Sequence, residues 1–373
     1  MKRLVVCCDG TWQEANQPYP TNVKRIFQAI KTTETAQPQH LYYRQGIGSG
    51  GNVWNRLMGG AFGWGIDDNI QEAYQFLCHN YAPGDEIYLF GYSRGAYTVR
   101  SLGGLMRIAG GVMAKQDADK IPALYDIYRS EGDYSDANQI SEDDLNRREL
   151  ARKEAAVQAL GATIQSATIT VLCCWDTVGS LGIPNTVPFI SQKINQKYKF
   201  HDCQLSNIIQ RALHAVAIDE PRHAFDITPM EQSQANIDAG QVLHQVWFPG
   251  NHGAVGGGVQ ALQPLSDGAL LWAIDMIRHT FQLGLEFDPN LIEFDPDDPN
   301  PSQHFEIRPD PRAKVPEQPV PWVFRLTGLK PRTIEDDDEL HQSVFERWQA
   351  LTTYRPKNMP SALVAKLNLA QTV

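Results

Sequence analysis

The stretch Asp85–Ala96, with the sequence DEIYLFGYSRGA, constrains the fold of this chain more than any other segment. Residues 87–90 form a short apolar run that is typical of a buried strand, and residues 91–95 match the pattern G-x-S-x-G. A helix should follow, because apolar residues recur at helical spacing at Ala96, Val99, Leu102, Leu105 and Met106. Strand, tight turn and helix predict a nucleophile elbow, which holds a serine above the strand ends. We therefore expect Ser93 to be a nucleophile; the alternative is an ordinary turn whose serine caps the helix.

The segments before this motif alternate between strands and helices, which predicts a parallel sheet with right-handed crossovers. Leu4–Cys8 is a continuous apolar run, and its loop at residues 9–12 follows at a carboxyl strand end. At the elbow, a side chain in place of Gly91 or Gly95 would clash where the helix crosses the strand. The other expected elements are a helix from Thr21 or Asn22 to about Lys31, a strand over His40–Arg44 and a helix over Ile66–Tyr81.

The whole chain fits a single α/β-hydrolase domain over residues 1–373, with a mostly parallel central sheet and helices on both faces. Residues 114–162 are polar and predict a helical insertion, and residues 286–321 are rich in Pro and Asp and predict an irregular excursion. The acidic run Asp336–Glu339 is expected to be a solvated helix start rather than a calcium loop. The remaining expected elements are helices over Ile121–Glu131 and Ser141–Leu160, a strand over Ala167–Trp175, a helix over Leu205–Asp219, a strand over Val242–Phe248 and a helix over about Ser266–Leu283.

Three predicted strand ends deliver Ser93, Asp176 and His252 in the chain order of an α/β-hydrolase. A serine hydroxyl is a weak nucleophile near neutral pH, so a base must remove its proton during attack. His252 can act as that base and later protonate the leaving group, and a carboxylate behind it fixes the tautomer. Glycines around His252 allow its loop to reach over the site. These residues predict a catalytic triad.

Other acids compete with Asp176 for the place behind the histidine. Asp267 lies at the start of the helix that follows His252, and Asp219 ends a predicted helix. Asp219 also has Glu220 and Arg222 beside it, and we interpret these three as a structural charge network. The sequence favours Asp176 and leaves Asp267 and Asp219 open.

An acyl-transfer site also needs an oxyanion hole. One donor should be the N–H of Arg94, the residue after the nucleophile, and the other should come from the loop after the first strand, at Gly10 and Thr11. Asp9 precedes this loop. We expect it to support the loop by hydrogen bonds, and the alternative is a metal ligand.

Aromatic residues near these elements are candidates for contact with substrate. They are Trp12, Tyr92, Trp54 and Phe62, the last two within the glycine-rich apolar stretch 52–65. The alternative is that these side chains belong to the core.

Composition narrows the classes of partner. The net charge is −10, which disfavours non-specific binding to nucleic acid or an anionic bilayer. The six cysteines include two adjacent pairs inside strand-like runs and show no C-x-x-C spacing, which fits a reducing, cytoplasmic environment. We expect no signal peptide and no transmembrane segment, and export by a route without a cleaved signal is compatible with this.

Eight motifs spread over nearly the whole chain resemble the Tle1-like α/β-hydrolase family, some members of which are phospholipase effectors of type VI secretion. They are CCDGTW (7–12), GIGSG (46–50), LFGYSRGAYTVRSLGGL (89–105), WDTVGSLGIP (175–184), HAVAIDEPRHAF (214–225), VWFPGNHGAVGGG (246–258), LSDGAL (265–270) and YRPKNMP (354–360). The resemblance implies a serine lipase-like fold, with Ser93 at the nucleophile position and His252 at the histidine position. The family's usual form of the last histidine motif is HSDVGGG, so Ala254 stands in place of an aspartate.

The sequence therefore predicts a serine hydrolase of carboxylic esters, with lipids or phospholipids as substrates, an acyl-Ser93 intermediate and no cofactor or metal. A secretion or immunity partner is expected if the chain acts as an effector. Two alternatives stay open at this point. One is a catalytically silent hydrolase fold used for interaction, and the other is a metal-dependent hydrolase that uses Asp9 and Asp176.

Overall fold

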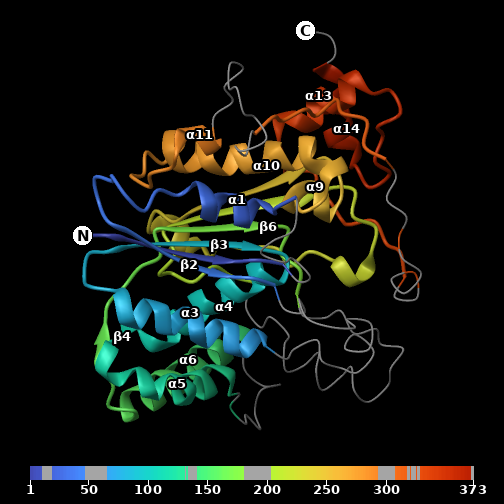
Figure 1. Cartoon of the computed structure of the whole chain (residues 1–373). Coiled ribbons are helices and arrows are strands. Elements are labelled where there is room, and N and C mark those ends of the chain that lie inside the picture. The colour runs from blue at the N-terminus through green and yellow to red at the C-terminus, as the bar shows by residue number, and fades with distance from the viewer. Residues whose placement is uncertain are drawn as a thin grey trace.

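The computed structural model describes residues 1–10, 19–46, 65–130, 132, 141–179, 203–292, 307–316, 320, 325 and 328–370. Within this part of the chain, seven strands form one sheet in the order β2-β1-β3-β6-β7-β8-β9, and every neighbouring pair is parallel (Figure 1). The predicted α/β-hydrolase fold is confirmed. The strands are β1 (Arg3–Cys8), β2 (Gln39–Arg44), β3 (Glu86–Tyr92), β6 (Val171–Trp175), β7 (Arg211–Ala217), β8 (Val242–Phe248) and β9 (Glu339–Leu340).

The strand order reverses between β1 and β3. β1 pairs with β2 on one side and with β3 on the other, although β2 precedes β3 in the chain. In an open parallel sheet, the crevice at such a reversal lies beyond the carboxyl ends of the strands and is the usual place for a ligand. The loop at Gly10 and the turn at Ser93 leave the sheet at these two neighbouring ends.

Helices cover both faces of the sheet (Figure 1). Alternate residues of each buried strand enter opposite cores, so that Leu4 and Val6 pack on one side and Val5 and Cys7 on the other. Burial on both faces explains why β1 reads as an unbroken apolar run. One face carries α1 (Asn22–Ala29), α9 (His252–Gly256), α10 (Gln263–Asp275) and α11 (Pro289–Ile292), and the other carries α3 (Ile66–Asn80), α4 (Arg94–Ala109), α5 (Ile121–Arg129) and α6 (Glu142–Ala159).

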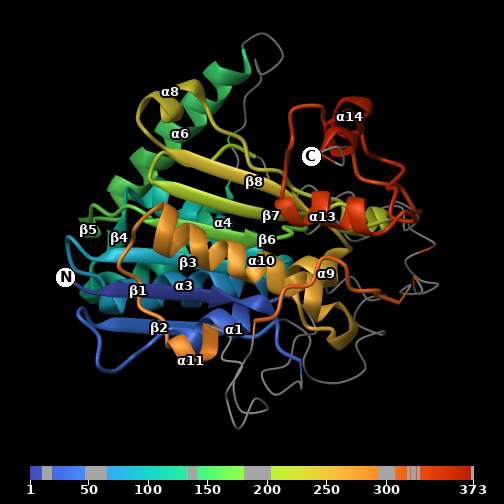
Figure 2. The ribbon, with the colours of Figure 1, turned by 90° about the horizontal axis from the view of Figure 1, so that it is seen from above.

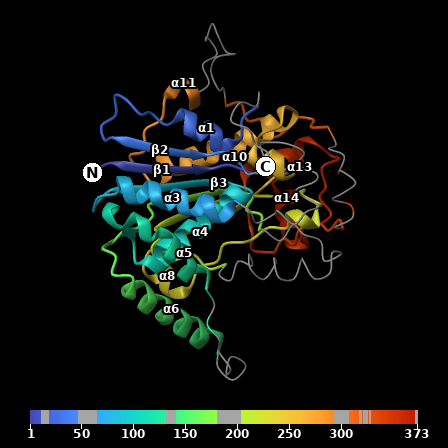
Figure 3. The same ribbon diagram turned by 60° about the horizontal axis from the view of Figure 1, so that its bottom comes forward.

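The polar insertion forms helices α5 and α6, as the sequence predicts, and α6 lies at the outer rim of its layer (Figure 3). A two-stranded antiparallel sheet of β4 (Val112–Met113) and β5 (Ile164–Gln165) joins its two ends. Short elements elsewhere are the 3₁₀ turns Lys115–Lys120, His223–Phe225 and Gln260–Leu262, the helix α8 (Gln234–Asp238) and the π-helical turn Met276–Thr280, which extends α10.

Two predicted helices are wrong. The segment Leu205–Asp219 contains the strand β7, which pairs with β6 and β8 at the centre of the sheet. Its run ALHAVA is buried on both faces, and such a strand has no alternating pattern that separates it from a helix. The acidic run also starts no helix, because Asp336 and Asp337 form a turn before β9.

The C-terminal helices α13 (Gln342–Ala350) and α14 (Ser361–Leu369) lie beside the carboxyl ends of the strands (Figure 2). Their apolar faces form a third core with β7 and β8, which contains Val216, Trp247, Ile334, Trp348 and Leu363 among others. This packing brings the last part of the chain to the edge of the sheet where the elbow lies. No helix among the described residues is both long and apolar enough to cross a membrane.

Candidate active site

Ser93 occupies the turn between β3 and α4 with backbone angles of φ 56° and ψ −122°. A non-glycine residue in this region is strained, as a nucleophile elbow requires. A Cβ atom on Gly91 would lie 2.5 Å from Cα of Ala96, and one on Gly95 would lie 2.0 Å from the carbonyl oxygen of Cys8. These contacts bear out the predicted clash. The Ser93 side chain makes no capping hydrogen bond to α4, so the turn is not an ordinary capped one.

The structure brings Ser93, His252 and Asp176 into one hydrogen-bonded row. Nε2 of His252 lies 2.9 Å from Oγ of Ser93, and Nδ1 lies 2.5 Å from Oδ2 of Asp176. The three side chains follow β3, β8 and β6 respectively, and each residue is less than 8% exposed. His252 is the first residue of α9, whose N-terminus is capped by the Asn251 side chain, which accepts a hydrogen bond from Ala254 N. This arrangement can transfer a proton from serine to histidine.

Asp176 is fully buried and ionised. Its Oδ1 accepts from the backbone N–H of Ala217 at 2.9 Å, and both of its oxygens accept from the guanidinium of Arg332. Burial by itself would raise the pKa of Asp176, but the charge of Arg332 and the hydrogen bond with His252 outweigh it and hold the pKa well below the ordinary range. The lowered pKa favours the ionised carboxylate, which can accept a hydrogen bond from His252.

His252 is held from several sides. Its backbone N–H donates to Oε2 of Glu220 at 3.2 Å, and its carbonyl oxygen accepts from the hydroxyl of Tyr92 at 3.2 Å. The rings of Tyr92 and Phe225 lie 4.7 Å and 4.9 Å from the imidazole, the latter edge-on. Burial lowers the pKa of His252 below its ordinary value, against the opposing effect of Asp176. The imidazole is accordingly poised as a neutral base.

Glu220 and Arg222 form the pair that the sequence suggests. Nε of Arg222 lies 2.5 Å from Oε1 of Glu220, and the guanidinium stacks 3.7 Å from the Phe225 ring centroid. Asp219 does not join this pair. Its Oδ2 accepts from Gly250 N at 2.7 Å and from the Tyr354 hydroxyl at 3.0 Å. The expected three-residue charge network is thus a two-residue one.

Asp267, the other alternative acid, also lies away from the histidine. It pairs with Arg25 of α1, and its Oδ2 accepts from Arg308 N at 2.7 Å. Of the three candidate acids, the structure brings Asp176 to His252.

Gly10, which follows β1 and Asp9, lies against the serine. A Cβ atom on Gly10 would be 3.2 Å from Cβ of Ser93. The Gly10 N–H donates to Oδ1 of Asp9 at 2.7 Å, and Oδ2 of Asp9 accepts from the hydroxyls of Thr21 and Tyr43. Asp9 therefore binds Gly10, and the Gly10 N–H is already engaged; that Asp9 supports the rest of the loop stays a prediction. Burial raises the pKa of Asp9 to about 6, against these hydrogen bonds.

Of the other residues predicted to form the oxyanion hole or to contact substrate, some lie within the described part of the chain and some lie outside it. Arg94 is the first residue of α4, directly after the serine. Tyr92 is 3% exposed and packs beneath His252, which is a supporting position, and its contact with substrate stays a prediction. Thr11, Trp12, Trp54 and Phe62 lie outside the described residues.

Sequence reasoning missed Arg332 and Phe225. Arg332 follows Asp176 by 156 positions, in a segment with no recognisable motif, and only the folded chain brings them together. Phe225 lies at the end of a quoted motif, HAVAIDEPRHAF, which could have drawn attention to it.

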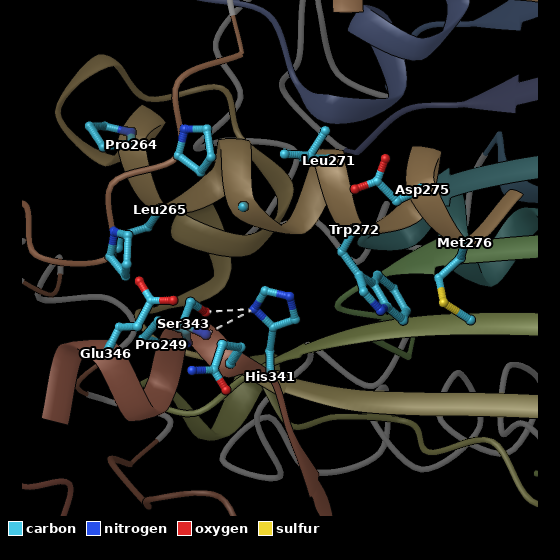
Figure 4. Close-up of a pocket in the computed structure, with 14 residues that line it drawn as sticks. Pro249, Pro264, Leu265, Leu271, Trp272, Asp275, Met276, His341, Ser343 and Glu346 are labelled. Carbon is cyan, nitrogen blue, oxygen red and sulfur yellow. Dashed lines mark hydrogen bonds between the residues drawn. The ribbon is translucent and has the colours of Figure 1, made fainter. Parts of the chain in front are cut away.

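A separate pocket of about 280 Å³ lies between α10 and α13 (Figure 4). Its apolar lining includes Leu265, Leu271, Trp272 and Met276, and the ring of His341 faces Ser343 at one side. None of the three residues of the hydrogen-bonded row lines it. Among the described residues, no group of three or more His, Cys, Asp or Glu side chains could hold a metal ion.

A family model described as "T6SS, Phospholipase effector Tle1-like, catalytic domain" matches residues 2–276. An uncharacterized protein of Saccharomyces cerevisiae, YEL023C, is 28% identical over 246 residues, which make up 61% of this chain and 33% of the relative. The chain thus spans about a third of the length of that curated relative.

Solved structures with a similar chain path include a Tle1 effector bound to the VgrG spike of the type 6 secretion system. It is 16% identical, with a TM-score of 0.35 and coverage of 70% of this chain and 53% of that one. An uncharacterized protein from Pseudomonas aeruginosa is 12% identical, with a TM-score of 0.43 and coverage of 84% and 49%. The chain spans about half the length of each.

Proposed function

Because this chain belongs to the family of Tle1-like type VI secretion phospholipase effectors, we propose that it is a serine hydrolase that cleaves carboxylic esters of lipids, with phospholipids as the preferred class. The observation that carries the proposal is the hydrogen-bonded row from Ser93 through His252 to Asp176, next to a strained turn. Because the family is one of secreted effectors, we also propose a partner, which would be a component of the secretion apparatus or an immunity protein.

In the proposed reaction, Oγ of Ser93 attacks the ester carbonyl while Nε2 of His252 takes its proton. The carbonyl becomes a tetrahedral oxyanion, for which the N–H groups of Arg94 and Thr11 are the proposed donors. His252 then protonates the departing alcohol, which leaves an acyl group on Ser93. Water attacks this acyl-enzyme with His252 again as base, and release of the fatty acid restores the serine. Asp176 keeps the proton on Nδ1 throughout.

Labelling by a fluorophosphonate probe tests the proposal directly, because the Oγ of an activated serine attacks the probe's phosphorus and displaces fluoride, and the reaction needs no knowledge of the substrate. We expect one adduct on Ser93 in the folded protein and none in the Ser93→Ala variant. A panel of phospholipids, neutral glycerides and short esters then identifies the substrate class by Ser93-dependent hydrolysis.

Two outcomes would contradict the proposal. Absence of an adduct, together with esters left intact, would favour a silent fold used for interaction. Hydrolysis that survives Ser93→Ala and stops on addition of a chelator would favour the metal-dependent alternative with Asp9 and Asp176.

A further inference from the structure

Arg332 belongs to the part of the chain beyond residues 2–276, yet its guanidinium lies inside the candidate site. Nη1 is 2.5 Å from Oδ1 of Asp176, and Nη2 is 2.9 Å from Oδ2, so the pair is bidentate. The same two nitrogens donate to the carbonyl oxygens of Ala217 at 2.9 Å and Phe225 at 2.6 Å. The residue is 3% exposed. Four acceptor oxygens, two of the Asp176 carboxylate and two of the backbone, therefore hold the buried guanidinium in place beside His252.

The segment that carries Arg332 is held in place at this residue and two positions after it. Nδ2 of Asn358 donates to the carbonyl oxygens of Arg332 and of Ile218, at 3.0 Å and 3.1 Å. Ile334 enters the third core, where it shares a cluster with Trp348 of α13. The packing of the C-terminal helices thus determines where the guanidinium lies.

A cation on Asp176 changes what the carboxylate can do for His252. A lone buried carboxylate stabilises a neighbouring imidazolium and raises the pKa of the histidine. A bidentate arginine offsets that negative charge, and the imidazolium gains less. His252 then stays neutral, and able to accept the serine proton, to a lower pH. The bidentate contact also fixes the plane of the carboxylate.

We propose that Arg332 is a positioning residue of the candidate site, which orients Asp176 and keeps His252 in its neutral form to a lower pH. The C-terminal segment thereby completes a site whose other members lie within the family's catalytic domain. This inference rests on the proposed function only for its effect on rate, because its effect on His252 can be measured without any substrate.

Other charged residues surround the pair of Arg332 and Asp176, and they must be the same in every variant compared. Glu220 and Arg222, on the segment after β7, act on His252, and Asp226 and Glu220 act on Arg332. His214 of β7 is a further titratable residue near this site, and its Nε2 accepts a hydrogen bond from the N–H of Thr177. None of the variants compared changes these groups.

The experiment titrates His252 by NMR in protein labelled with ¹³C at histidine Cε1, with the His252→Asn variant to assign its signal. Arg332→Met and Arg332→Gln remove the charge, the latter with a donor retained. We expect both variants to raise the pKa of His252 by about one unit. The histidine would then be half protonated at a proton concentration about tenfold lower than in the wild type. Arg332→Lys keeps a charge without the bidentate fork, so the pKa should stay near the wild-type value.

Arg25→Met is the matched control, because Arg25 pairs with a different buried carboxylate, Asp267. It should leave the His252 titration unchanged. The rate of Ser93 labelling, measured against pH, gives the second readout. Its acidic limb should move to higher pH in Arg332→Met and stay in place in Arg332→Lys, whose maximal rate should fall at least threefold.

An unchanged His252 titration in folded Arg332→Met or Arg332→Gln would overturn the proposal. If neither variant folds, Arg332→Lys decides: a His252 pKa raised by a full unit, or a labelling rate equal to that of the wild type, would overturn it. If His252 shifts as expected while wild-type Ser93 takes no probe, the role of Arg332 stands and the proposed hydrolase function fails.

Discussion

Nε2 of His252 lies 2.9 Å from Oγ of Ser93, although 159 positions of sequence separate them. The sheet makes this contact, because the two residues follow parallel strands whose carboxyl ends share one edge. We expect this contact to depend on the residues that surround it.

Asp176→Asn should reduce kcat about 10⁴-fold, because an amide cannot hold the proton on Nδ1 of His252. It should also lower the free energy of unfolding by about 3–5 kcal/mol, since it leaves Arg332 buried beside a neutral group. Asp267→Asn is the matched control, because Asp267 is also a buried carboxylate paired with an arginine. We expect it to be destabilised by a similar amount with kcat near the wild-type value. Equal losses of kcat in the two variants, measured on folded protein, would rule out Asp176 as the specific acid.

Gly95→Ala should prevent folding or destabilise the chain by more than about 3 kcal/mol, because its Cβ would lie 2.0 Å from the backbone oxygen of Cys8. Gly268→Ala offers the comparison. Gly268 lies within helix α10, and the nearest atom to an added Cβ is 3.9 Å away, on Pro309. This substitution should be neutral or stabilising by up to about 1 kcal/mol. Urea unfolding of both variants checks the contrast, and equal stability would show that the elbow tolerates a side chain.

Asp9→Asn should give a pH-dependent difference in stability. The pKa of Asp9 is raised from 3.8 to about 6 in the folded protein, so the folded state binds this proton more tightly than the unfolded state does. The stability that Asp9 contributes is present below about pH 4 and is lost as the pH rises to about 6, by roughly 3 kcal/mol. Asparagine does not titrate in this range. The free energy of unfolding of wild type minus that of the variant should therefore fall between pH 4 and pH 7, and a constant difference would contradict this.

The same variant should also slow the labelling of Ser93 by the fluorophosphonate probe. Its amide oxygen can still accept from Thr21 and Tyr43, but its N–H₂ donor then faces the Gly10 N–H, which is also a donor. Gly10 would then move from its place against Ser93. We expect a loss of about tenfold in labelling rate at pH 7. Asp336→Asn, at an exposed carboxylate, controls for the loss of one charge.

Tyr92→Phe separates a supporting residue from a substrate contact. The variant keeps the ring beneath His252 and removes the hydroxyl that donates to the His252 carbonyl oxygen. We expect a loss of about 1 kcal/mol in stability and a fall of a few-fold in kcat, with KM unchanged. A raised KM with unchanged kcat would instead support the contact with substrate that the sequence suggests.

The local parts of this site could be predicted from the sequence, and the distant parts could not. The elbow at Ser93 is specified by adjacent residues, namely a buried strand, two glycines and an apolar helix face. The sequence of β7 wrongly predicts a helix, because its run ALHAVA is mostly apolar and burial on both faces removes the period that distinguishes a strand. Arg332 is unpredictable for another reason, since its function depends on a contact with Asp176 that no local pattern encodes.

The bond between Arg332 and Asp176 also bears on the order of events during synthesis. A ribosome makes the serine, the acid and the histidine, together with strands β1 to β8, well before it reaches residue 332. Until then the carboxylate of Asp176 would be buried without its counter-charge, at a cost of several kcal/mol. The nascent chain should therefore keep this end of the sheet open until the C-terminal helices can dock. The hydrogen-bonded row from Ser93 to Asp176 would in this way be completed only after residue 332 has been made and its segment has docked.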